Sequence, residues 1–221
     1  MASSIVGIAT SRQDSAVTSH PITLPTGSVG DYLLLLFVHR DATISASASS
    51  WGVPFYSLPG TSGDFKGSFY NYRVVTTLPA ITVTTSAPAE SAAIVYRWSG
   101  TAGTNSIQQT GASGTSSSPN AGFLLPYPAW PGGFGQQLYF AVYDGAVTRS
   151  AWPTDYTLGQ TAVESVGASA DLGVASAIKL VTTSESPGSW ALSGSAGWRG
   201  IVFLLEDLAN CTFKKNNVGC C

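Results

Sequence analysis

Charged residues are scarce in this sequence. Asp, Glu, Lys and Arg make up 10% of the 221 residues, whereas an ordinary soluble domain contains roughly 25%. The formal net charge is only −2, and the ten Lys and Arg residues are scattered rather than grouped into a basic patch, so we expect no nucleic acid as a partner. The surface must consist largely of hydroxyls, amides and backbone, a composition that suits assembly better than catalysis.

The sequence also lacks the marks of membrane and secreted proteins. Its longest apolar runs, Leu33–Val38 and Ile201–Leu205, fall far short of the roughly 18 to 20 residues that span a bilayer. The opening residues MASSIV contain neither the basic segment nor the long apolar segment of a signal peptide. We therefore expect no membrane as a partner, and synthesis in a cytoplasm.

Motifs of catalysis are missing as well. Gly60–Gly63 and Gly111–Gly114 each begin like a serine-hydrolase motif but lack its closing glycine. The carboxylates are spread singly, so no acid–base pair for glycoside cleavage can be named, and no phosphate-binding glycine loop occurs. His39-Arg40-Asp41 has suitable residue types for acid–base chemistry, but we interpret it as a strand end that emerges into water. We expect no enzyme activity, no cofactor and no metal site.

The sequence does contain a regular succession of expected strands. Short apolar runs alternate with stretches of Ser, Thr, Gly and Pro from Ser3 to Leu205, which is typical of all-β sandwiches and barrels. Such domains commonly reach roughly 200 to 250 residues, so we predict one domain over residues 1–207 and an irregular extension over 208–221. The clearest expected strands are Ile5–Ala9, Asp31–His39, Gly67–Val75, Ile81–Thr85, Ala92–Trp98, Gln137–Tyr143, Leu172–Val181, Trp190–Leu192 and Trp198–Glu206.

Two segments interrupt this succession of expected strands. Thr101–Asn120 is mostly Gly, Ser, Thr and Ala, too poor in large apolar residues to pack a core, so we expect a mobile or surface connection. Leu125–Gly135 is rich in proline and carries the large rings of Tyr127, Trp130 and Phe134. Stiff aromatic loops make contact surfaces at low entropic cost; the alternative is that these rings fold back over an open end of the sandwich.

The extension carries all three cysteines of the chain, Cys211, Cys220 and Cys221. In a reducing compartment an odd number of cysteines indicates free thiols; the alternative is disulfides between neighbouring copies once particles reach oxidising surroundings. Zinc would need a fourth ligand, and neither His20 nor His39 is near in sequence.

Three arginines in expected strands have aromatic neighbours: Arg73, Arg97 and Arg199. Because side chains alternate along a strand, Tyr96 and Trp98 should point to one face and Arg97 to the other. We interpret these arginines as structural, stacked on rings or paired with a carboxylate such as Glu90 or Glu206.

Four parts of the chain resemble a known family: Ser28–Leu35, Tyr70–Val75, the pair Ile81–Thr85 and Ala93–Gly100, and Gly197–Leu205. In these segments and their spacing the chain resembles β-sandwich structural proteins of tailed bacteriophages, which are jelly-roll-like domains among decoration, fibre and minor virion proteins. The resemblance covers most of residues 1–207. It implies an antiparallel, jelly-roll-like β-sandwich in a virion component assembled in the host cytoplasm, with no catalytic residues to carry over.

Our first hypothesis is a capsid decoration, or cement, protein. It would bind the major capsid protein on the outside of the head as a homotrimer and bridge adjacent capsomers, with weak contacts multiplied by symmetry. The loop and the extension are polypeptide beyond what a sandwich needs, so we assign interface roles to residues within them. These candidates are Tyr127, Trp130, Phe134, Phe213, Lys214 and Lys215, with Cys211, Cys220 and Cys221 for intersubunit disulfides.

The alternative is a tail fibre or receptor-binding domain that recognises a host surface glycan. Sugar sites place an aromatic ring against the sugar, and Trp51, Tyr127 and Trp130 would supply such rings if they were exposed together. A glycan-cleaving enzyme ranks last, because it needs two converging carboxylates.

Overall fold

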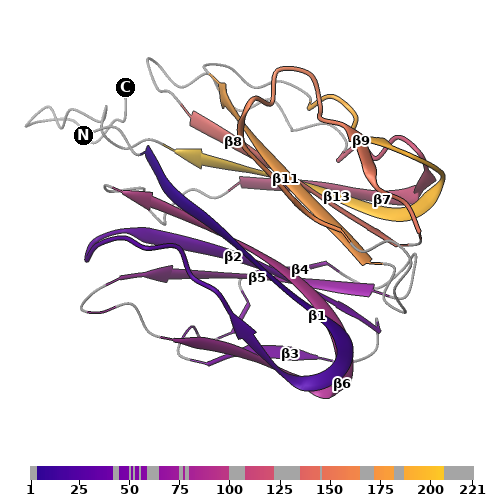
Figure 1. The fold of residues 1–221 in the computed structure, drawn as a ribbon. Coiled ribbons are helices and arrows are strands. Elements are labelled where there is room, and N and C mark those ends of the chain that lie inside the picture. The colour runs from indigo at the N-terminus through magenta and orange to yellow at the C-terminus, as the bar shows by residue number, and fades with distance from the viewer. Residues whose placement is uncertain are drawn as a thin grey trace, which may run out of the picture.

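The computed structural model describes residues 4–41, 45–49, 51, 53–54, 56–58, 65–74, 77, 80–99, 108–121, 135–144, 146–164, 172–181 and 187–206. Within these ranges the chain forms strands and no helix. Every pairing between the strands is antiparallel, and two large sheets stack on one another (Figure 1). The expected antiparallel β-sandwich is therefore confirmed.

Each sheet is built from one half of the chain. The first sheet has the order β1-β6-β2-β5-β4, with β3 beside β6, and the second has the order β10-β11-β8-β13-β7. Strands β9 and β12 form a small sheet of their own. The bounds in the first half are β1 Ser4–Ile22, β2 Tyr32–Arg40, β3 Ala46–Ala48, β4 Tyr56–Leu58, β5 Phe65–Arg73 and β6 Ile81–Ser99. In the second half they are β7 Gln108–Ser116, β8 Gly135–Asp144, β9 Arg149–Ala151, β10 Leu158–Val163, β11 Leu172–Val181, β12 Ala191–Leu192 and β13 Ala196–Glu206.

The two halves follow the same plan. In the first, β6 inserts between β1 and β2, with β5 and β4 beyond β2; in the second, β13 inserts between β7 and β8, with β11 and β10 beyond β8. In each sheet the central strand pairs on both sides, as in the rows Phe69–Leu36–Ile94 and Ser176–Phe140–Ile201. This order differs from a jelly roll, whose strands pass back and forth between two sheets.

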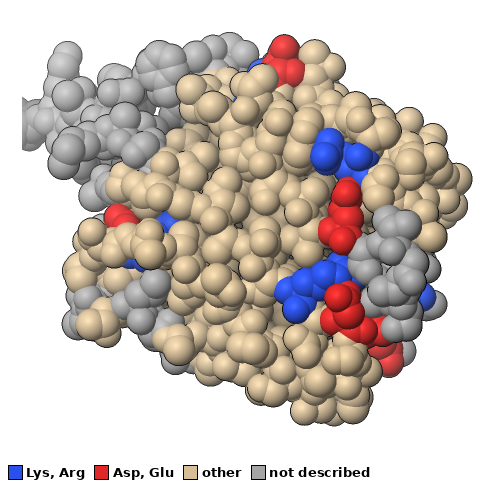
Figure 2. All heavy atoms as spheres, in the orientation of Figure 1, with Lys and Arg blue, Asp and Glu red and all other residues tan. Residues whose placement is uncertain are grey.

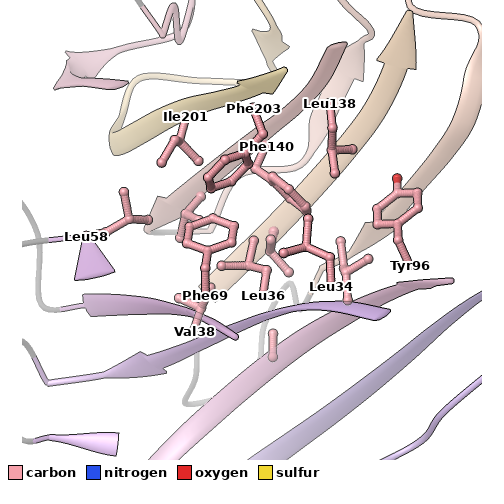
Figure 3. Packing of buried hydrophobic residues seen from close by; sticks show 14 of the residues in the cluster. Leu34, Leu36, Val38, Leu58, Phe69, Tyr96, Leu138, Phe140, Ile201 and Phe203 are labelled. Atoms are coloured by element: carbon pink, nitrogen blue, oxygen red, sulfur yellow. The ribbon is translucent and has the colours of Figure 1, made fainter. Parts of the chain in front are cut away.

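The main core lies between the two large sheets (Figure 3). Side chains alternate along a strand, so Leu34, Leu36 and Val38 of β2 point into this core and meet Leu138 and Phe140 of β8. Burying each such side chain contributes roughly 1.5–3 kcal/mol. The long apolar runs of the sequence, Leu33–Val38 and Ile201–Leu205, lie in β2 and β13, which both contribute to this core.

Both sheets are also covered on their outer faces, which explains why β2 is buried on both sides. Strands β1 and β6 are long and curved. The last residues of β1 and the first residues of β6 pair with each other, and β6 pairs there with β3, so that the three strands form a layer over the first sheet (Figure 1). Trp51 and Val83 of this layer pack on Leu35 and Phe37 of β2. The small sheet of β9 and β12 covers the second sheet in the same way, with Trp190 against Tyr139.

Two sequence-based expectations are wrong in detail. Ile81–Thr85 and Ala92–Trp98 belong to one continuous strand, β6, because Ala89 and Ser91 between them still pair with β1 across an irregularity in the register. Residues 108–116 of the expected mobile connection form strand β7. An edge strand needs few large side chains, since backbone hydrogen bonds to β13 hold it in place and Gly114 lets the Trp198 ring lie close against it.

Candidate functional site

Charged side chains gather at the end of the sandwich where β2 and β8 finish. Arg40 ends β2, Asp144 ends β8, and the two form an ion pair at 3.4 Å that joins the sheets. Arg12 of β1 pairs with Asp14 and donates from Nη1 to the Leu172 carbonyl at 3.0 Å. Figure 2 shows most of the charged side chains of the visible face along its right side and a few at its other edges, whereas the broad middle of that face carries none.

A pocket of ≈ 130 Å³ opens between the sheets near this end. Arg199 is the charged residue among the described residues of its lining, and its side chain is deeply buried. The guanidinium carbon lies 5.5 Å from the centre of the Phe65 ring. Burial lowers the pKa of Arg199, and Tyr56 partly opposes this shift. The lining residues are Tyr56, Leu58, Gly111, Ala112, Ser113, Arg199 and Gly200.

His39 does not emerge into water, as we had expected of a strand end. It is fully buried under the outer layer of the first sheet, and its Nδ1 lies 3.3 Å from the Arg40 carbonyl. Burial lowers the pKa of His39, which disfavours the charged form of the ring. The second histidine, His20, is also buried and lies between Ser91 and Thr85, at 2.9 and 3.2 Å. Both rings contribute to packing beside Phe37 rather than to an open site.

Arg97 is structural, as its alternation with Tyr96 and Trp98 predicts. Those two rings belong to the core between the sheets, whereas Arg97 points away from it and is fully buried. Its Nε donates to Asp31 at 2.8 Å, and its other nitrogens donate to the carbonyls of Pro25 and Ser28 at 2.9 and 2.8 Å. The carboxylate partner is thus Asp31 rather than Glu90 or Glu206. Asp31 lies just before β2, more than sixty residues earlier in the chain, and no local pattern indicates this pairing.

The residues that the sequence singled out for interfaces lie outside the described residues. They are Tyr127, Trp130, Phe134, Phe213, Lys214 and Lys215, together with the cysteines Cys211, Cys220 and Cys221. The side chain of Arg73 lies outside them as well.

Trp51, in contrast, is described and is not available to a sugar. It is 7% exposed, and its ring stacks on Tyr72 with the ring centres 5.3 Å apart. The exposure that would let Trp51 supply a ring to a sugar site is therefore not met. An apolar ring in a short loop is equally suited to covering a sheet, and here it completes the outer layer.

The chain matches no protein-family model, and it has no match among curated proteins or solved structures. In the described ranges, no three or more His, Cys, Asp or Glu side chains come together as metal ligands. The same part of the chain contains no helix of the length and hydropathy that cross a membrane.

Proposed function

We propose that this chain is a non-enzymatic structural protein of a tailed-phage virion, and specifically a capsid decoration protein. It binds the major capsid protein on the outer surface of the head, as a trimer, and stabilises the shell. The observation that carries this proposal is the broad uncharged middle of the face in Figure 2, on a chain with only 10% charged residues. A surface with few charges loses little hydration energy when it is buried against a large partner.

Hydroxyl groups on the outer layer of the first sheet support the same proposal. Ser47 of β3 and Ser19 of β1 flank Thr84 of β6 on one exposed surface, and the Ser47 and Thr84 hydroxyls lie 2.9 Å apart. Next to this row the Ser86 hydroxyl accepts a hydrogen bond from the Ser45 amide at 3.0 Å. Hydroxyls that already have partners within the protein cost less to bury than unpaired polar groups. This surface therefore favours close contact with a capsid.

The glycan-binding alternative loses support from the burial of Trp51. Two aromatic residues of its expected platform, Tyr127 and Trp130, lie outside the described residues. It remains the second candidate because of the family resemblance alone.

The location of the chain on particles tests the proposal. Virions that carry a small tag on this chain should show, by electron microscopy with a tag-specific label, hundreds of copies spread over the head, because decoration follows the symmetry of the shell. Untagged virions serve as the control for nonspecific label. A handful of copies at the tail tip would favour the receptor-binding alternative instead, and label on neither part would reject a virion role.

A further inference from the structure

The outer layer of the first sheet consists of β3, residues 19–22 of β1 and residues 81–85 of β6 (Figure 1). It joins the sheet through a bend, because the pairing of β1 with β6 shifts register twice between Gln13 and Ser19, on either side of Val17. Such irregularities bend a strand and interrupt its ladder of hydrogen bonds. The contacts between the layer and the sheet therefore decide whether the layer stays closed.

Both histidines of the chain lie between this layer and the sheet. His20 belongs to the layer and His39 to strand β2 of the sheet, and they are 2% and 0% exposed. Their rings adjoin Phe37 of β2, with ring centres 5.2 and 5.9 Å from its centre. The layer thus closes over the two side chains of the sequence whose ordinary pKa lies closest to neutral pH.

The hydrogen bonds of His20 fit the neutral ring. The Thr85 hydroxyl donates to the Ala87 carbonyl at 2.7 Å, so it accepts from Nε2 of His20, 3.2 Å away. The other ring nitrogen, Nδ1, then accepts from the Ser91 hydroxyl at 2.9 Å. Thr85 lies in the layer, whereas Ser91 pairs directly with His39 in the sheet. Neutral His20 therefore bonds the layer to the sheet.

His39 is suited to the neutral form for a different reason. Its Nδ1 lies 3.3 Å from the Arg40 carbonyl, which can only accept, so this nitrogen carries the proton of the neutral ring. Its Nε2 is buried and has no hydrogen-bond partner. A second proton there would be a buried donor without an acceptor, which costs free energy that an exposed histidine would not pay.

The charges around the two rings also oppose protonation on balance. Lys66 of β5 pairs directly with His39, so both side chains point to the same face of the sheet. Burial lowers the pKa of both histidines; of the charges near His39, Lys66 and His20 add to this shift and Asp41 opposes it. Glu90 of β6 follows Ser91 by alternation on the other face of its strand. The layer itself contributes no charged side chain besides His20.

We propose that the outer layer is an acid-sensitive switch, which is closed while His20 and His39 are neutral and opens about the bend at Val17 when both are protonated. A histidine that is held neutral stabilises the closed form above its ordinary pKa of about 6.5, and this contribution is lost as the pH falls below that value. Opening exposes Leu35 and Phe37 of β2, on which the layer packs. The core between the two sheets contains neither histidine and stays closed. This switch goes beyond the proposed decoration role and does not depend on it.

Hydrogen exchange of the full chain at pH 7.5 and pH 5.0 tests the proposal. The lower pH stays above the ordinary pKa of Asp and Glu, about 3.9 and 4.3, so the histidines are the side chains that change charge. Protection factors, which correct for the pH dependence of chemical exchange, should fall roughly tenfold or more at pH 5.0 for the amides of residues 46–48 and 82–85; the limit is about thirtyfold for each histidine. Amides of β8 and β11 in the second sheet should keep their protection. Unchanged protection of the layer, or an equal loss in β8 and β11, would overturn the proposal.

A chain without histidine identifies the groups that titrate. His20→Gln keeps an acceptor for Ser91 and a donor for Thr85, and His39→Met fills the second site with an uncharged side chain. In the double variant the protection of the layer should change less than about threefold between the two pH values. His20→Gln alone keeps His39 and should retain part of the loss, which gives a second reading if the double variant fails to fold. A loss in either variant as large as in the unaltered chain would reject the assignment to these histidines.

Discussion

Replacing Arg97 with methionine is expected to lower the free energy of unfolding by about 3–5 kcal/mol, the cost of removing one partner of a buried ion pair. Methionine fills much of the same volume but leaves the Asp31 carboxylate without its cation, at a position where the Asp31 side chain is only 8% exposed. The Pro25 carbonyl also loses the Arg97 donor, and the Ser28 carbonyl keeps only the Asp31 amide of its two donors. Urea unfolding followed by tryptophan fluorescence measures the loss.

Two further variants distinguish the effect of leaving a buried charge unpaired from the effect of removing a charge at the surface. Lys179→Met breaks the exposed pair with Asp155, at 3.4 Å, and should cost less than about 1 kcal/mol, as surface pairs do. The double variant Arg97→Met with Asp31→Leu should be more stable than Arg97→Met alone, because no buried charge is left unpaired. A loss at Arg97 no larger than the loss at Lys179 would contradict the structural role assigned to the buried pair.

Phe69→Ala is expected to lower the free energy of unfolding by a similar amount, about 3–5 kcal/mol, because it opens a cavity at the centre of the core. The Phe69 ring is fully buried and meets Phe203 and Phe140 edge-on, with ring centres 4.6 and 5.2 Å apart (Figure 3). Such aromatic pairs each add about 0.5–1.5 kcal/mol beyond the area that they bury. Thermal and urea unfolding of the variant measure the change.

A small buried residue of the second sheet gives a sharp comparison. Ser176 pairs with Phe140 of β8, and its hydroxyl lies 2.7 Å from the Tyr96 hydroxyl, which donates to the Gly159 carbonyl. Ser176→Ala should therefore cost only about 1 kcal/mol, the value of one hydrogen bond. Val53 is 86% exposed, and Val53→Ala should stay within about 0.5 kcal/mol. Equal losses at Phe69 and Ser176 would mean that the aromatic cluster does not dominate the core.

Strand positions could be predicted because they follow from local pattern. A short, mostly apolar run predicts β11 with its observed bounds, Leu172–Val181, and the alternation of side chains along a strand places Arg97 opposite Tyr96 and Trp98. Strand β7 was missed because its stability comes from backbone bonds to a strand about ninety residues away, rather than from its own side chains.

The candidate site was harder to predict for a related reason. The pocket depends on the absence of large side chains at Gly111 and Ser113. Small residues indicate a pocket only when the residues facing them, here Tyr56 and Leu58, are known. The repeated plan of the two halves is equally a matter of long-range pairing, since it lies in the order of the strands within each sheet. Pairing of distant strands is the part of a β fold that local sequence specifies least.

The binding of purified chain to phage heads that lack it tests the decoration role most directly. The account predicts saturable binding at hundreds of copies per head, with a fixed number of copies at each repeating position of the capsid. It also predicts that the shell ruptures at a higher temperature once the heads are covered. Heads that already carry a full complement should bind no more. Failure to bind bare heads, or binding that leaves the rupture temperature unchanged, would contradict the account.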